Sequence, residues 1–147
     1  MSNPKPLAVI YARVSTVRQV KEGNGLSSQI TTCRKFAEER GFEVVDLFTD
    51  DETGRSDERE GFRKLKKWIR DTKGQERVVL IDAISRLSRD VEVYAGIRKI
   101  AREHGASFAS PTFRFEDTPA GRFMETIHVG FGQLEAETNA ETVVRRQ

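Results

Sequence analysis

Short apolar runs alternate along this chain with longer stretches in which apolar residues recur every three or four positions. The apolar runs cover residues 7–12, 42–48, 77–84 and 106–111, and the helical stretches cover residues 26–41, 60–74 and 90–105. Each helical stretch finishes near a glycine, which is typical of the end of an α-helix. Strands that alternate with helices over short connections predict an α/β fold, a three-layer sandwich with a mostly parallel central sheet.

The last part of the chain has no strand pattern. Pro119 suits the first turn of a helix, with Thr118 as its N-cap. Apolar residues then recur at helical spacing, at Phe123, Ile127 and Leu134. We therefore expect residues 1–118 to form the α/β domain and residues 119–147 to begin a long helix. The sequence ends in VVRRQ without a capping residue, so we expect a chain cut from a longer one; a frayed natural terminus is the alternative.

Composition limits the class of protein. A length of 147 residues suits one domain with a core of its own, and a formal net charge of +2 neither requires nor excludes a nucleic-acid partner. The single cysteine, Cys33, excludes an internal disulfide and fits the reducing environment of the cytoplasm. The sequence contains neither an apolar run of membrane-spanning length nor a signal peptide.

Several common catalytic motifs are absent from the sequence. It lacks the GxxxxGK[ST] and GxGxxG loops that bind nucleotide phosphates, and its two histidines, His104 and His128, form no zinc-binding set. The acidic stretch TDDETG, residues 49–54, is typical of a solvated turn, although its carboxylates could attract a divalent metal. Asp50 remains a candidate because it ends a strand at the carboxyl edge of the sheet, where open α/β sheets bind ligands.

Arginines gather directly after three of the predicted strands. The clusters contain Arg13 and Arg18 on either side of Ser15, then Arg55 and Arg59, then Arg86 and Arg89. Because parallel strands end at the same edge of a sheet, we expect the clusters to converge, and their guanidinium groups then repel one another unless an anion lies between them. Phosphate is the natural anion, since guanidinium binds its oxygens in a bidentate manner. The alternative is that polar loops commonly contain arginine.

Ser15 lies within the first of these clusters. A serine hydroxyl is a weak nucleophile that needs activation, yet neither a Ser-His-Asp arrangement nor a GxSxG turn is visible. Dense positive charge would instead stabilise the additional negative charge of a phosphoryl transition state. Tyr11 lies in the middle of the first strand and is expected in the core. The residues alone therefore predict an α/β domain with a phosphate-handling site that contains Ser15.

Several short motifs occur in an order that resembles a known family. They are YARVST followed by RQ, LSSQ at the start of a helix, FTDDETG, REGFRKL, SRLSRD, and GRFMETI before the long helix. Together, over residues 7–135, they resemble the catalytic domain of serine site-specific recombinases, a family of resolvases, invertases and large serine integrases. The combination of YARVS and RLSRD in an α/β pattern is the most specific part. The long loop between Gln19 and Gln29 favours the large-integrase branch.

The resemblance implies a mechanism and partners. Ser15 would attack a DNA phosphodiester to form a 5′-phosphoserine link, followed by strand exchange and religation without ATP, metal or another cofactor. Arg13, Arg86 and Arg89 would hold the scissile phosphate. Supporting roles would belong to Gln19, Gln29, Asp50, Arg59, Ser85 and Glu135, and DNA contacts to Arg18, Arg55, Arg122, Arg145 and Arg146. The implied partners are double-stranded DNA and further copies of the chain, as a dimer through the long helix and a tetramer in the active complex, with no membrane.

The sequence departs from the family pattern in two places. Ser85 stands where the family commonly has an aspartate, and AETNAET follows Glu135 where the family usually continues with arginine-bearing sequence. The acid or base role sometimes given to that aspartate therefore has no assigned residue here. Two alternatives stay open: a DNA-binding or assembly module of the same fold that has lost catalysis, and an unrelated α/β phosphate-ester hydrolase.

Overall fold

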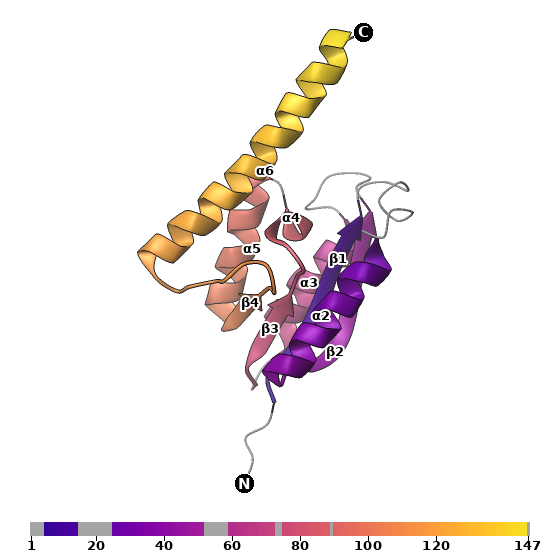
Figure 1. The fold of residues 1–147 in the computed structure, drawn as a ribbon. Helices are drawn as coiled ribbons and strands as arrows, with labels where there is room; N and C mark the ends of the chain where they lie inside the picture. Colours follow the sequence, from indigo (N-terminus) through magenta and orange to yellow (C-terminus); the bar gives the residue numbers. More distant parts are fainter. Residues whose placement is uncertain (1–4, 15–24, 52–58, 73–74, 89, 147) are drawn as a thin grey trace.

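A computed structural model describes residues 5–14, 25–51, 59–72, 75–88 and 90–146, with only the backbone of residues 136 and 139–146. Its elements are β1 (Leu7–Val14), α2 (Leu26–Arg40), β2 (Glu43–Asp51), α3 (Glu60–Asp71), β3 (Arg77–Leu80), α4 (Ile84–Leu87), α5 (Val91–His104), β4 (Ala106–Ala109) and α6 (Pro119–Arg146), as labelled in Figure 1. The strands form one sheet in the order β2-β1-β3-β4, and all neighbouring pairs are parallel. The predicted fold class, with its parallel central sheet, is therefore confirmed.

The predicted third strand, residues 77–84, is wrong at its end. Strand β3 stops at Leu80, and the chain then forms the short helix α4 from Ile84 to Leu87. Ile84 and Leu87 are both buried and stand three positions apart, which fits one face of a helix. The apolar run could not reveal this change, because a short buried strand and a short buried helix have the same composition.

Other elements differ from the prediction only at their ends. Strand β1 continues to Val14, so Arg13 belongs to the strand and not to the loop that follows it. Helix α3 ends at Asp71, earlier than the predicted stop at Gly74, which lies outside the described residues. Helices α2 and α5 end as predicted, at Gly41 and Gly105, where φ is 75° and 74°. This left-handed backbone favours glycine over residues with a Cβ atom.

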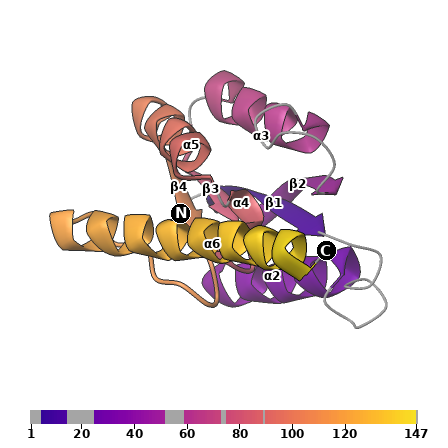
Figure 2. The same ribbon diagram turned by 90° about the horizontal axis from the view of Figure 1, so that it is seen from above.

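Helices cover both faces of the sheet. Figure 2 shows α2 on one side of it and α3 and α5 on the other. Side chains alternate along β1, so that Ala8 and Ile10 pack with Cys33 of α2 while Val9 and Tyr11 belong to the core beneath α3 and α5. The central strand is therefore buried on both faces, as its continuous apolar run predicts.

A buried arginine ties α3 and α5 to the sheet at the amino end of β3. The face of α3 predicted to be buried, which contains Phe62, Leu65 and Ile69, is buried in the structure. Beside it, the guanidinium of Arg77 donates hydrogen bonds to the carbonyl oxygens of Ile69 and His104, in the last turns of α3 and α5. A cation is favoured there because the carboxyl ends of helices carry partial negative charge.

Helix α6 runs beside α4 and α5 and then continues past the body of the domain (Figure 1). Its exposed large apolar side chains are Phe123, Met124, Phe131 and Leu134, whereas Glu125 and Val129 are buried against the domain. The buried side of α6 thus includes a carboxylate, and much of its apolar surface faces outward. Within the described ranges, none of the helices has the length and apolar character that would let it cross a membrane.

The buried carboxylate of Glu125 is held by two residues of α5. Arg98 Nε lies 2.9 Å from Glu125 Oε1, and the Tyr94 hydroxyl donates a hydrogen bond to the same oxygen. Burial and this hydrogen bond raise the pKa of Tyr94 well above its ordinary value. The Arg98 guanidinium also lies 4.8 Å from the centre of the Phe108 ring. These contacts set one position of α6 along α5.

Replacing Glu125 tests this attachment. We expect Glu125→Ala to lower the free energy of unfolding by about 2–4 kcal/mol, because the partly buried Arg98 and the buried Tyr94 hydroxyl both lose their carboxylate partner. Urea denaturation followed by circular dichroism measures the change. The control is Glu116→Ala, which removes a pair with Arg114 at 3.5 Å whose side chains are 51% and 89% exposed, and which should change stability by less than about 1 kcal/mol. Equal effects of both variants would contradict the role of Glu125.

Candidate active site

Strands β1 and β3 are neighbours in the middle of the sheet, but the chain leaves them in opposite directions. From β1 it crosses to β2 at one edge, and from β3 it crosses to β4 at the other. The carboxyl ends of β1 and β3 therefore lie on either side of the point where the strand order reverses, which is where open α/β sheets bind ligands. Arg13 lies near the end of β1, and Arg86 lies in α4, which follows β3.

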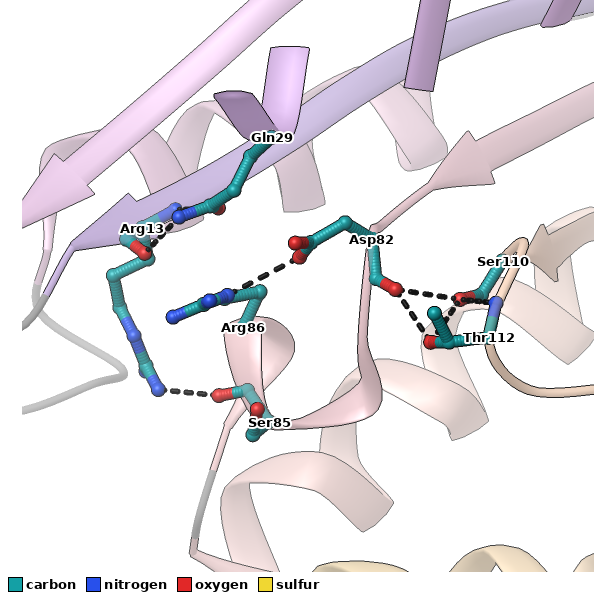
Figure 3. Close-up of polar contacts among 7 residues, drawn as sticks. All are labelled: Arg13, Gln29, Asp82, Ser85, Arg86, Ser110 and Thr112. Carbon is teal, nitrogen blue, oxygen red and sulfur yellow. Dashed lines mark hydrogen bonds and ion pairs between the residues drawn. The ribbon is translucent and has the colours of Figure 1, made fainter. Parts of the chain in front are cut away.

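The main chain of Arg13 is fixed by Gln29 of helix α2. Strand β3 pairs with β1 only as far as Ile10, so Arg13 lies beyond the end of this pairing. The Arg13 N–H donates to Gln29 Oε1 at 3.0 Å, and Gln29 Nε2 donates to the Arg13 carbonyl oxygen at 2.8 Å (Figure 3). The two residues are only 3% and 2% exposed. The amide of Gln29 thus takes the place of a neighbouring strand and keeps Arg13 extended.

Two guanidinium groups make polar contacts at or beside helix α4. Arg13 Nη2 donates to the carbonyl oxygen of Ser85 at 2.5 Å. Arg86 Nε lies 3.1 Å from Asp82 Oδ1. Figure 3 shows the guanidinium group of Arg86 directed toward the Arg13 side chain. Two cations on one side of a strand end can bind an oxyanion between them, and phosphate oxygens match the donor geometry of guanidinium.

Strand β2 places a carboxylate at the same edge of the sheet. Asp50 accepts hydrogen bonds from the Tyr11 hydroxyl at 2.6 Å and from the N–H groups of Gly61 and Phe62, both at 2.8 Å. These N–H groups belong to the first turn of α3, whose partial positive charge favours an anion. A Cβ atom on Gly61 would lie 2.5 Å from the Thr49 carbonyl oxygen, so this close approach of helix and strand requires glycine.

Burial and nearby charges shift the pKa of the Tyr11 hydroxyl. Burial and the hydrogen bond to Asp50 raise the pKa of Tyr11 well above its ordinary value, while the positive charges of Arg13 and Arg59 act in the opposite direction. Arg13 of β1 and Arg59 before α3 therefore both act electrostatically on this hydroxyl. Tyr11 is buried, as predicted, but its hydrogen bond to Asp50 was not visible in the sequence.

A cavity of about 360 Å³ lies on the other side of α4, toward α6. Its polar lining includes Ser85, His128 and Glu135. The ring of His128 meets that of Phe113 edge to face, with 5.0 Å between their centres. Glu135, which the family resemblance assigns to the neighbourhood of the site, therefore lies at the same cavity as Ser85. No set of three or more His, Cys, Asp or Glu in the described ranges is placed to hold a metal ion.

The structure brings together part of the predicted site. Arg13, Gln29, Ser85 and Arg86 gather between β1 and α4, and Asp50 and Arg59 lie on the β2 side. Outside the described residues are Ser15, Arg18, Gln19, Arg55 and Arg89, and the side chains of Arg145 and Arg146 are not described either. Arg122 pairs with Asp117 at 3.1 Å near the start of α6 and does not contact this group. The roles assigned to these residues stay predictions.

Asp82 is a candidate site residue that the sequence analysis missed. The predicted strand over residues 77–84 contains it, and a strand gives no reason for its carboxylate to meet Arg86. The spacing of four residues between an acid and an arginine is a helical signal. It becomes informative only when the chain from Asp82 onward is known to leave the sheet and turn into α4.

Known proteins share both the sequence pattern and the fold. The family model described as "Resolvase, N terminal domain" matches residues 8–146. The chain is similar to the C-terminal catalytic domain of ISC1926 TnpA, an IS607-like serine recombinase, at 31% identity and a TM-score of 0.59 over 71% of this chain and 69% of that one. It is similar to the N-terminal catalytic domain of TP901-1 integrase at 26% identity and a TM-score of 0.65, over 90% and 98%.

A resolvase family site-specific recombinase from Streptococcus pneumoniae has the same fold, with a TM-score of 0.65 at 20% identity over 96% of this chain and 95% of that one. Comparison with curated protein sequences gave no match. The likeness therefore comes from the family pattern and from solved structures, and it extends over nearly all of the chain.

The two hydrogen bonds between Gln29 and the main chain of Arg13 can be tested by substitution. We expect Gln29→Leu to lower the free energy of unfolding by about 2–4 kcal/mol, because it removes two buried hydrogen bonds to the main chain at nearly constant volume. Guanidinium denaturation measures the loss. Ser28→Ala, at an exposed position next to it on α2, is the control and should stay close to the unmodified chain. A Gln29→Leu variant of unchanged stability would mean that these two hydrogen bonds do not stabilise the domain.

Proposed function

This chain belongs to the resolvase N-terminal domain family and is a serine recombinase catalytic domain, and from this we propose that it cleaves and rejoins DNA with Ser15 as the nucleophile. The observation that carries the proposal is the position of Arg13. It is buried, fixed in its main chain by Gln29, and separated from Ser15 by a single residue. Ser15 directly follows the last residue of β1 in the sequence, which supports a role for it beside a phosphate bound by Arg13 and Arg86.

The proposed step is a transesterification at one DNA phosphodiester. The Ser15 oxygen attacks the phosphorus of a DNA phosphodiester and loses its proton to a base. The bond from phosphorus to the 3′ oxygen breaks, and that oxygen leaves as a hydroxyl after taking up a proton. The product is a 5′-phosphoserine ester, and attack by a 3′-hydroxyl reverses the reaction and rejoins the DNA. Because the ester bond is conserved, rejoining requires no nucleotide hydrolysis.

The arginines would act on the charge of the phosphate. Negative charge on the phosphoryl oxygens is redistributed in the transition state, and donors already in place stabilise it without reorganising. Arg13 and Arg86 are supported in this role by their positions around α4, and we assign Arg89 to it by the resemblance. Gln29 holds Arg13, and Asp50 holds the start of α3 beside it. We further assign Gln19 and Arg59 supporting roles on the resemblance alone.

Helix α6 is proposed as the surface for self-association. Phe123, Met124, Phe131 and Leu134 expose apolar side chains along it, and exposed apolar patches commonly mark protein interfaces. Two copies related by a twofold axis would pair this surface with itself and form a dimer. The active complex would contain four copies around two duplexes. Arg145 and Arg146 would then follow the interface toward the DNA.

One observation favours a second candidate function. Ser85 stands where the family commonly has an aspartate, so the chain lacks one carboxylate that the family pattern expects beside Arg86. A domain of the same fold that binds DNA and assembles without cutting would tolerate this change. Covalent attachment to DNA separates the two functions, because an assembly module forms no ester with DNA.

Ser15→Ala should abolish covalent attachment. The full-length protein is incubated with a library of double-stranded DNA in EDTA, denatured in detergent, and assayed for protein joined to a 5′ phosphate. The unmodified protein is expected to form this adduct, and Ser15→Ala to reduce it at least about 1,000-fold, because the attacking oxygen is missing. Ser28→Ala is the control and should behave as the unmodified protein.

An adduct that persists in Ser15→Ala would reject Ser15 as the nucleophile. An unmodified protein that binds DNA without any adduct would favour the assembly module. Cleavage that leaves no adduct and depends strictly on added metal would favour a phosphate-ester hydrolase.

The proposed interface gives a separate prediction. We expect Phe131→Glu to weaken self-association at least about tenfold, because a charge would have to lose its hydration in an apolar contact. Analytical ultracentrifugation over a range of protein concentrations measures the effect. Lys99→Glu, at an exposed position of α5, introduces the same new side chain elsewhere and should leave association unchanged. Equal weakening by both variants would mean that net charge, and not this surface, controls association.

A further inference from the structure

Asp82 and Arg86 form an ion pair across the start of α4. Asp82 Oδ1 lies 3.1 Å from Arg86 Nε, and the two side chains are 20% and 18% exposed. Exposed pairs at this spacing contribute little to stability, whereas pairs shielded from water interact more strongly and hold a defined geometry. The partial burial of both side chains therefore favours a geometric role for this contact.

The atoms used in the pair leave the outer part of the guanidinium available. Asp82 contacts Arg86 through Nε, and the two terminal Nη groups are not part of this contact. In Figure 3 they point away from the carboxylate and toward Arg13. An arginine held at Nε can still present both Nη groups to the oxygens of a phosphate.

The main chain of Asp82 is itself fixed by the segment after β4. The hydroxyls of Ser110 and Thr112 both donate to the Asp82 carbonyl oxygen, at 3.1 Å and 2.5 Å (Figure 3). Just before it, the Ile81 N–H donates to the Ala109 carbonyl oxygen at 3.2 Å. The main chain of Asp82 therefore has little freedom to move, and the Arg86 side chain that pairs with Asp82 is positioned relative to the sheet.

The negative charge of Asp82 also acts on a group of helix α2. Burial, followed by the negative charge of Asp82, raises the pKa of the Cys33 thiol to about 12. Cys33 is fully buried on the inner face of α2, so the Asp82 charge acts on a group inside the domain as well as on Arg86. Together with its exposed fraction of 20%, this is consistent with a carboxylate that is largely shielded from solvent.

The charge of Asp82 offsets a repulsion at this site. The Arg86 guanidinium is directed toward the Arg13 side chain, whose own guanidinium reaches the Ser85 carbonyl oxygen, and like charges in a partly buried place repel. Ser85 contributes only its carbonyl oxygen to Arg13, since the chain has no carboxylate at that position. One negative charge on the far side of Arg86 lets the guanidinium stay in place before phosphate binds.

We propose that Asp82 is a positioning residue, which orients the Arg86 guanidinium for the reacting phosphate. The inference rests on the function proposed above, in which Arg86 binds that phosphate. Asp82 does not touch the DNA. It acts through Arg86 and takes over, from a different position on the chain, the charge that the family pattern provides at position 85.

The test uses full-length protein and measures the rate of adduct formation at saturating DNA, together with DNA affinity. Asp82→Asn keeps the shape of the side chain and removes its charge. We expect it to lower the maximal rate about tenfold while DNA affinity stays the same, because the charge-assisted contact to Arg86 is weakened. Asp82→Glu, which restores the charge, should recover part of the rate. Glu60→Gln removes another carboxylate paired four residues away, with Lys64 at 3.1 Å, and should have no effect.

A double-mutant cycle distinguishes positioning from general stability. In an Arg86→Lys background, which lacks the Nε group, Asp82→Asn should lower the rate no further. The same tenfold loss in that background would overturn the proposal, because Asp82 would then act independently of Arg86. A wild-type rate in Asp82→Asn would overturn it as well. So would a loss in both Asp82 variants that matches a loss of folded protein in thermal melts.

Failure of this inference can be told from failure of the proposed function. If adduct formation requires Ser15 and Arg86 but not Asp82, the recombinase reaction stands and only the positioning role is wrong. If the unmodified protein forms no adduct at Ser15, the proposed reaction itself is wrong.

Discussion

The two hydrogen bonds from Gln29 to the main chain of Arg13 are the contact on which this edge of the molecule depends. Strand β1 stays paired with β2 to its end but continues past its pairing with β3, so on the β3 side its last residues need a partner that is not a strand. Because Gln29 supplies one, Arg13 stays extended and its guanidinium reaches the Ser85 carbonyl in α4. The cation is thus placed by the fold itself, and little ordering remains when an anion binds.

Helix α3 lies at the same edge of the sheet, and charged side chains at both of its ends fix its position. Asp50 accepts from the N–H groups in the first turn of this helix, and Arg77 donates to a carbonyl in its last turn. Asp50 belongs to β2 and Arg77 to β3, so the helix is tied to the sheet at both ends as well as through its apolar face. The carboxylate of Asp50 is therefore engaged with the helix and with Tyr11, and its charge is partly neutralised near the arginines.

Helix α6 combines a polar attachment with an outward apolar surface. Glu125 fixes it to α5 through Arg98 and Tyr94, while Phe131 and Leu134 are exposed. It differs in this from an ordinary amphipathic helix, which buries its apolar face and exposes its charges, although Val129 of α6 does pack into the core. The arrangement fits a helix that packs on its own domain with one side and on another copy of the chain with the other. The cavity lined by Ser85 and Glu135 lies between α4 and α6, next to the candidate site.

The sequence by itself determined the α/β class, the central position of the first strand in the core, the helix ends at Gly41 and Gly105, and the family, because each depends on local spacing or on short motifs. It also placed Arg13, Gln29 and Arg86 among the candidates. It could not determine that Gln29 replaces a strand beside Arg13, that Glu125 is buried, or that Asp82 meets Arg86. These facts depend on where β3 stops and on which helix packs beside it. Only the tertiary structure decided them. In a longer β3, for example, Asp82 and Arg86 would share one face of the sheet but lie about 13 Å apart along the strand, too far to form an ion pair.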